Sequence, residues 1–101
     1  MAHKTSFKDL IKSEQPVLVD FTAAWCGPCK MMSPVLDKVK KKIGGNAKIV
    51  KIDIDRNQQF ARNMNVSGVP TFVLFKEGKE QWRKVGMISE HQLLDVLEQF
   101  Q

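Results

Sequence analysis

Trp25-Cys26-Gly27-Pro28-Cys29-Lys30 lies between the apolar run Val17-Leu18-Val19-Asp20-Phe21 and a segment with helical periodicity. Its two cysteines are the only ones in the chain. A cysteine at a helix start lies near unpaired backbone N–H groups and the positive end of the helix dipole, which stabilise the thiolate. A second cysteine one turn later can close a small disulfide ring with the first. The stretch therefore predicts a reactive dithiol.

The length of 101 residues predicts a single domain, residues 1–101, that can bury a core without disulfide staples. No apolar run is long enough to span a membrane. The segment Met1 to Thr5 lacks the apolar core of a secretory signal, so a cytoplasmic protein is expected. In that compartment a lone cysteine pair is more often catalytic or metal-binding than structural.

The net charge of +5 raises the question of nucleic-acid binding. Six lysines cluster in the middle of the chain, at Lys38, Lys40, Lys41, Lys42, Lys48 and Lys51. No aromatic residues interleave with them, and Lys38 to Lys42 close a helix, where cations complement the dipole. A solvated basic face is therefore favoured, and neither a nucleic acid nor a membrane is an expected partner.

The first half of the chain predicts two helices and two strands. Ser6 is a good N-cap for a short helix that ends before Pro16. The following elements are a strand at Val17 to Phe21, a helix from Cys29 to about Ile43 with Pro34 inside it, and a strand at Ala47 to Ile54.

The second half predicts two further helices and a hairpin. A helix is expected at Arg56 to Asn63, with Asn57 or Asp55 near its start, and a strand at Thr71 to Phe75. Glu77-Gly78 is a tight turn, after which Glu80 to Val85 pairs back antiparallel. Ser89 to Gln92 is a capping-box start for a final helix with an apolar stripe at Leu93, Leu94, Leu97 and Phe100.

This order predicts an α/β fold. The strand–helix–strand units imply right-handed parallel crossovers, and the closing hairpin makes the sheet mixed. Helices must cover both faces because the central strands are apolar throughout. Sites in such sheets gather at the carboxyl ends of strands, where the cysteine pair lies.

Five motifs, in matching order and spacing over nearly the whole chain, resemble the thioredoxin family. They are Val19-Asp20-Phe21, the stretch from Trp25 to Lys30, Lys51-Ile52-Asp53-Ile54-Asp55, Ser67-Gly68-Val69-Pro70-Thr71 and Lys84-Val85-Gly86. The resemblance implies a thioredoxin fold with a mixed central sheet of four to five strands. The first strand is expected to be short or absent, since only residues 2–5 are left to supply it.

Cys26 is the predicted nucleophile because it lies nearer the helix N-terminus, and Cys29 is the predicted resolving cysteine. A zinc site is the alternative, but zinc needs about four ligands and only His3 and His91 remain as strong candidates. No metal is therefore expected. The resemblance implies that Gly27-Pro28 between the cysteines belongs to reducing members of the family.

Asp20 is the one charged residue in an apolar strand. It is either an aspartate facing water or a buried carboxyl with a raised pKa. By similarity to thioredoxins it accepts the proton of Cys29 when that thiol attacks, with Lys51 as its charge partner. A solvated strand lysine is the alternative for Lys51.

The family resemblance implies a cis peptide bond at Val69-Pro70, beside the cysteines. The exposed backbone of Val69 would then bind a substrate segment as an added strand. By position, the same groove is lined by Trp25, Gly27, Pro28, Ile54, Gly68, Gly86 and Met87. Packing remains an alternative for Trp25, a bulge or turn for Gly86 and a core cap for Met87.

The primary hypothesis is a reductant of protein disulfides, a monomer with no bound cofactor. The resemblance implies recharging by thioredoxin reductase, with NADPH as the indirect donor. It also implies clients of the ribonucleotide reductase, peroxiredoxin and methionine sulfoxide reductase types. The alternatives are a thioredoxin-fold binding or scaffold subunit, and an oxidative-folding oxidoreductase. In Thr22 the chain departs from the family, which usually has a tryptophan there.

Overall fold

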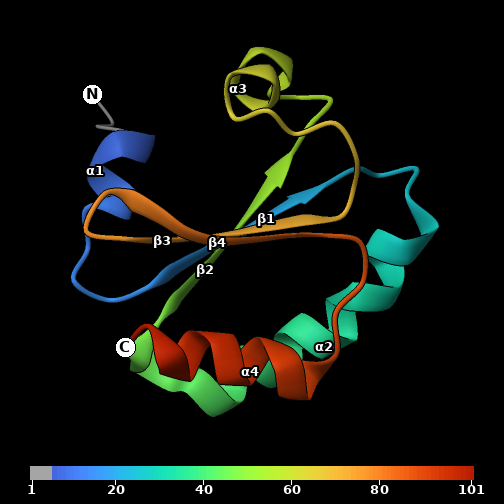
Figure 1. Ribbon diagram of the computed structural model, residues 1–101. Helices are drawn as coiled ribbons and strands as arrows, with labels where there is room; N and C mark the ends of the chain where they lie inside the picture. Colours follow the sequence, from blue (N-terminus) through green and yellow to red (C-terminus); the bar gives the residue numbers. More distant parts are fainter. Residues whose placement is uncertain (1–5) are drawn as a thin grey trace, which may run out of the picture.

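A computed structural model describes residues 6–101 and shows a four-stranded sheet (Figure 1). The strands are β1 (Val17–Thr22), β2 (Lys48–Asp53), β3 (Thr71–Lys76) and β4 (Lys79–Val85), in the order β2-β1-β3-β4. β1 is parallel to β2, and the other neighbouring pairs are antiparallel. The predicted mixed sheet is thus confirmed.

Helices cover both faces of this sheet, as the sequence predicts (Figure 1). α2 (Gly27–Ile43) and α4 (Glu90–Gln99) pack on one face, around Leu18, Phe72 and Leu74. α1 (Phe7–Ile11) and α3 (Gln58–Asn63) lie on the other, over Val19, Phe21, Val73 and Phe75. A 3₁₀ turn, η1 (Gly44–Asn46), follows α2. Residues of β1 and β3 alternate between the two cores.

The predicted caps and turns are present. Ser6 Oγ accepts a hydrogen bond from the Asp9 N–H, and Ser89 and Gln92 form the capping box. Glu77 and Gly78, both with positive φ, join β3 to β4. The left-handed conformation at both positions matches the twist of a two-residue hairpin.

Several predicted boundaries differ from the structure, and β1, β3 and β4 are each one residue longer than predicted. α2 begins at Gly27 rather than Cys29, because Cys26 is its N-cap. β2 is shorter than predicted at both ends, and α3 begins at Gln58 rather than Arg56. Asp53 accounts for the last difference, since its carboxylate accepts hydrogen bonds from the N–H groups of Asp55 and Arg56 and holds them in a turn. The prediction for residues 2–5 lies outside the described residues.

No helix among residues 6–101 is both long and apolar enough to cross a bilayer.

Candidate active site

The cysteine pair caps helix α2. Cys26 has an extended backbone, and its sulfur accepts a hydrogen bond from the Cys29 N–H at 3.1 Å. The two cysteines form a disulfide, with Cα atoms 5.3 Å apart. Both residues are buried, while Gly27 and Pro28 between them are exposed. On reduction, the same N–H groups and the helix dipole are in place to stabilise a thiolate on Cys26.

The loop that joins α3 to β3, residues 64–70, brings a second chain segment to the disulfide. The Val69–Pro70 peptide bond is cis, which confirms that prediction. The Val69 carbonyl oxygen lies 3.7 Å from Cys26 Sγ. The loop is tied to the sheet next to this point, because the Gly86 N–H donates to the Pro70 carbonyl at 2.8 Å and Thr71 Oγ1 donates to that of Gly68 at 2.6 Å. We call Gly68, Val69 and Pro70 the docking edge.

Asp20 is buried in β1, with 4% of its surface exposed. Its Oδ1 atom has no hydrogen-bond partner. Desolvation raises the pKa of the Asp20 carboxyl to about 6, and the positive charge of Lys51 acts in the opposite direction. The burial predicted for Asp20 is thus confirmed.

A cavity of about 210 Å³ connects Asp20 to Cys29. Its walls include Cys29, Ser33 and Lys51 as well as Asp20 itself. Lys51 pairs with Asp20 across β1 and β2 in register but is exposed to solvent. Lys51 is therefore a solvated strand residue whose charge still lowers the pKa of Asp20, so the two alternatives for this lysine do not exclude each other.

Comparison with known proteins identifies this arrangement. The sequence profile of the Thioredoxin family matches residues 1–99. The chain belongs to the thioredoxin family. It is 46% identical to a thioredoxin of Pseudomonas aeruginosa over 91 residues, which are 90% of this chain and 84% of the relative. A chloroplastic thioredoxin Y of rice is 43% identical over 95 residues, or 93% of this chain and 56% of the relative.

Solved thioredoxin structures share the fold. A thioredoxin mutant from Halobacterium salinarum superposes with a TM-score of 0.86 and 39% identity, covering 97% of this chain and 85% of its own. Oxidised mitochondrial thioredoxin 3 of Saccharomyces cerevisiae gives a TM-score of 0.83 and 35% identity, covering 92% and 86%. The mixed sheet and the Cys26–Cys29 disulfide are therefore those of a thioredoxin.

The residues of this thioredoxin-family chain that were predicted to line a substrate groove differ in how far their side chains are exposed. Trp25 and Met87 are 67% and 46% exposed, which excludes a core role for either side chain. Ile54 and Val69 are half-buried and pack against Cys26 and Cys29. Gly86 has a φ of +95°, which fits the turn alternative for this residue.

Sequence reasoning missed two residues at this groove. Trp25 Nε1 donates a hydrogen bond to Asp55 Oδ2 at 2.9 Å, which fixes the exposed indole. Asp55 lies in one of the quoted motifs, but only a role near a helix start was assigned to it. Val85 ends β4, as the sequence predicts, and it is 63% exposed beside Gly86. An apolar residue between Lys84 and a glycine was the available signal.

Thr22, where the family usually has a tryptophan, is half-buried and lines the cavity beside Asp20. Among residues 6–101 no group of three or more His, Cys, Asp or Glu side chains could hold a metal ion.

Proposed function

We propose that the chain reduces disulfide bonds in proteins by thiol–disulfide exchange. The observation that carries this function is the Cys26–Cys29 disulfide at the N-terminus of α2, with the exposed residues Gly27 and Pro28 between the two cysteines. In the reduced protein the Cys26 thiolate attacks one sulfur of a client disulfide and displaces the other as a thiolate. Cys29 then attacks Cys26 Sγ, which releases the second client thiolate and forms the internal disulfide.

Asp20 is proposed as the base for the second step. The Cys29 thiol must lose a proton before it attacks, and the Asp20 carboxylate lines the cavity that reaches Cys29. A pKa of about 6 leaves most Asp20 side chains ionised near neutral pH while keeping them basic enough to accept a proton. Lys51 would favour the ionised form through its charge.

The docking edge is proposed to hold the client. The Val69 carbonyl oxygen lies 3.7 Å from Cys26 Sγ, and an extended client segment would pair with this backbone as an added strand. Trp25 and Met87 would contact client side chains, because both are exposed and apolar. Gly27, Pro28, Ile54, Gly68, Pro70 and Gly86 would form the rest of the groove.

The electron source is proposed to be thioredoxin reductase with NADPH, in the cytoplasm, with the chain acting as a monomer that binds no cofactor. Membership of the thioredoxin family supports this assignment. Clients of the peroxiredoxin type fit as well. A structure on thiol resolution in a yeast mitochondrial 1-Cys peroxiredoxin through glutathione and thioredoxin systems matches with a TM-score of 0.85, 33% identity and coverage of 98% of this chain and 92% of that one.

Reduction of insulin disulfides in the presence of NADPH and thioredoxin reductase tests the function. The wild type should consume NADPH with insulin present, and Cys26→Ser should not. A wild type that consumes none would overturn the proposal. Trapping of the mixed disulfide distinguishes the roles of the two cysteines. Cys29→Ser should accumulate a mixed disulfide with the client, and Cys26→Ser should accumulate none.

A further inference from the structure

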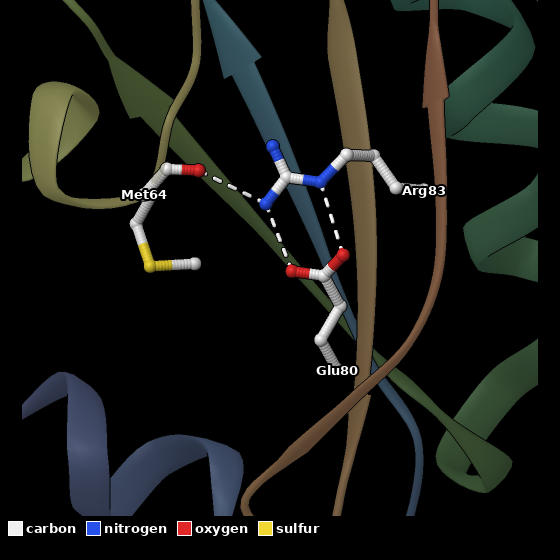
Figure 2. Close-up of polar contacts among 3 residues, drawn as sticks. All are labelled: Met64, Glu80 and Arg83. Carbon is white, nitrogen blue, oxygen red and sulfur yellow. Dashed lines mark hydrogen bonds and ion pairs between the residues drawn. The ribbon is translucent and has the colours of Figure 1, made fainter.

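Arg83 connects strand β4 to the start of the loop that carries the docking edge. Figure 2 shows its guanidinium between the backbone of Met64 and the carboxylate of Glu80. Nη2 donates to the Met64 carbonyl oxygen at 2.9 Å and to Glu80 Oε1 at 2.8 Å, while Nε donates to Glu80 Oε2 at 3.0 Å. We call these three hydrogen bonds the Arg83 clasp.

A β-bulge makes the clasp geometrically feasible. Residues three apart on a regular strand point to opposite faces, so Glu80 and Arg83 would not meet. Here Leu74 pairs with Trp82 but Phe75 pairs with Glu80, which leaves Gln81 as an extra residue. Bulges of this kind re-aim side chains.

The bulge places both side chains on the α1/α3 face. Glu80 is paired with Phe75 and Arg83 with Val73, and both apolar partners belong to the core on that face. Trp82, between them in sequence, packs instead against the core under α2 and α4. Glu80 and Arg83 therefore meet on the side of the sheet where α3 ends just before Met64.

The clasp fixes one end of a loop whose other end reaches the active site. Among residues 6–101, the bond from Arg83 is the only hydrogen bond that joins residues 64–67 to the sheet. At the other end of the loop, the Gly86 N–H of the same strand region holds the Pro70 carbonyl. Val69, whose carbonyl lies 3.7 Å from Cys26 Sγ, lies between these two attachments, and the neighbouring Gly68 carbonyl is also held by Thr71 Oγ1 at 2.6 Å.

We propose that Arg83 is a positioning residue for client docking, which holds the docking edge in the place where its backbone pairs with an extended protein segment. This proposal rests on the proposed reduction of protein disulfides. Arginine suits the role because its planar fork can bind a carboxylate in bidentate fashion and still donate to a carbonyl. Glu80 keeps the guanidinium oriented, and its own pKa is lowered by the same hydrogen bonds.

The proposal predicts a change in client affinity rather than in sulfur chemistry. Arg83→Gln should raise KM for insulin roughly three- to tenfold and leave kcat within about twofold, because a displaced docking edge weakens binding of an extended segment. The rate with dithiodipyridine, a small disulfide that needs no strand pairing, should stay within about twofold of the wild type. Arg83→Lys keeps the positive charge but lacks the planar guanidinium. This variant and Glu80→Gln should each raise KM for insulin less than Arg83→Gln does.

Lys79→Gln is the matched control, since it removes an exposed cation from the same strand. This variant should leave the rates with insulin and with dithiodipyridine unchanged. An unchanged KM for insulin in folded Arg83→Gln would overturn the proposal, as would an equal loss of rate with insulin and dithiodipyridine. Melting temperatures show whether each variant is folded.

Amide hydrogen exchange separates this proposal from the proposed function. In Arg83→Gln, exchange at residues 65–69 should be faster than in the wild type, with the β1 amides unchanged; unchanged exchange in the loop contradicts the clasp. A wild type that fails to reduce insulin would contradict the function instead, whatever the exchange rates are.

Discussion

At the scale of single residues, the charge state of Asp20 depends on where the sheet places it. The carboxyl is buried with an unpaired oxygen, and desolvation raises its pKa to about 6 from 3.8. The alternation of Asp20 with Val19 and Phe21 along the strand could not show that the carboxyl is buried, because a central strand buries both of its faces. A charged residue in an apolar run signalled burial, but the partner and the cavity required the register of β1 against β2.

Asp20 should make the protein less stable as the pH rises. The folded state binds the Asp20 proton more tightly than the unfolded state, so the free energy of unfolding falls between pH 3.8 and about 6. The loss from this group amounts to about 3 kcal/mol at most. Asp20→Asn should remove this loss and be roughly 1–3 kcal/mol more stable than the wild type at pH 8.

Urea denaturation of the oxidised protein at pH 4 and pH 8 measures this effect. The increase in the free energy of unfolding caused by Asp20→Asn should be large at pH 8 and small at pH 4. Asp37→Asn, an exposed carboxyl of α2, serves as the control and should show no such difference. A gain that is equal at both pH values would contradict a raised Asp20 pKa.

Lys51 should lower the pKa of Asp20 even though its side chain is exposed. The ammonium group favours the ionised carboxylate across the β1–β2 pair, so Lys51→Gln should move the Asp20 pKa further upward. Carboxyl carbon NMR titration measures the pKa directly. Lys48→Gln, on the same strand but opposite Val17, is the matched control. A downward shift in Lys51→Gln, or equal shifts in both variants, would rule out Lys51 as the charge partner.

At the scale of elements, helix and strand types were predictable because their apolar periods are clear. The ends were less so, since they depend on side-chain contacts with the backbone. Cys26 caps α2 through its sulfur, a role for which serine or aspartate is the usual residue. Asp53 likewise delays the start of α3 by binding two N–H groups. The bulge at Gln81 leaves no trace in the alternation of β4, which is mostly exposed.

Gly86 links two elements of the site and should resist substitution. Its φ of +95° is strained for any residue with a Cβ, and its N–H holds the Pro70 carbonyl. Gly86→Ala should therefore lower the free energy of unfolding by about 1–2 kcal/mol. Gly45→Ala is the control, because Gly45 has no positive φ and an added Cβ would meet no neighbour. Equal losses in denaturant titrations of the two variants would show that the conformation of Gly86 is unstrained.

At the scale of the whole molecule, the topology explains why distant motifs form one site. β1 ends just before the cysteines, β3 begins just after Pro70, and β4 ends at Val85 beside Gly86. Since β3 is antiparallel to both β1 and β4, its start meets their ends. The family resemblance predicted that Cys26, Val69 and Gly86 come together, and the strand directions give the physical reason. The hydrogen bond from Trp25 to Asp55 depends on loop geometry and was not predictable in this way.

The net charge of +5 should bias which protein clients are reduced fastest. Lys30 and Lys84 are exposed next to Cys29 and Val85, whereas Asp55 is bound to Trp25 and Asp20 is buried. Long-range attraction raises association rates of oppositely charged partners and is screened by salt. A disulfide peptide with glutamates beside its cysteines should react roughly threefold or more faster than its lysine counterpart at low salt.

Stopped-flow tryptophan fluorescence of the reduced protein gives the rates for both peptides, and the difference between these rates should disappear in about 0.5 M salt. Dithiodipyridine, which is uncharged, controls for salt effects on the sulfur chemistry. Equal rates for the two peptides at low salt would mean that the surface charge does not select clients.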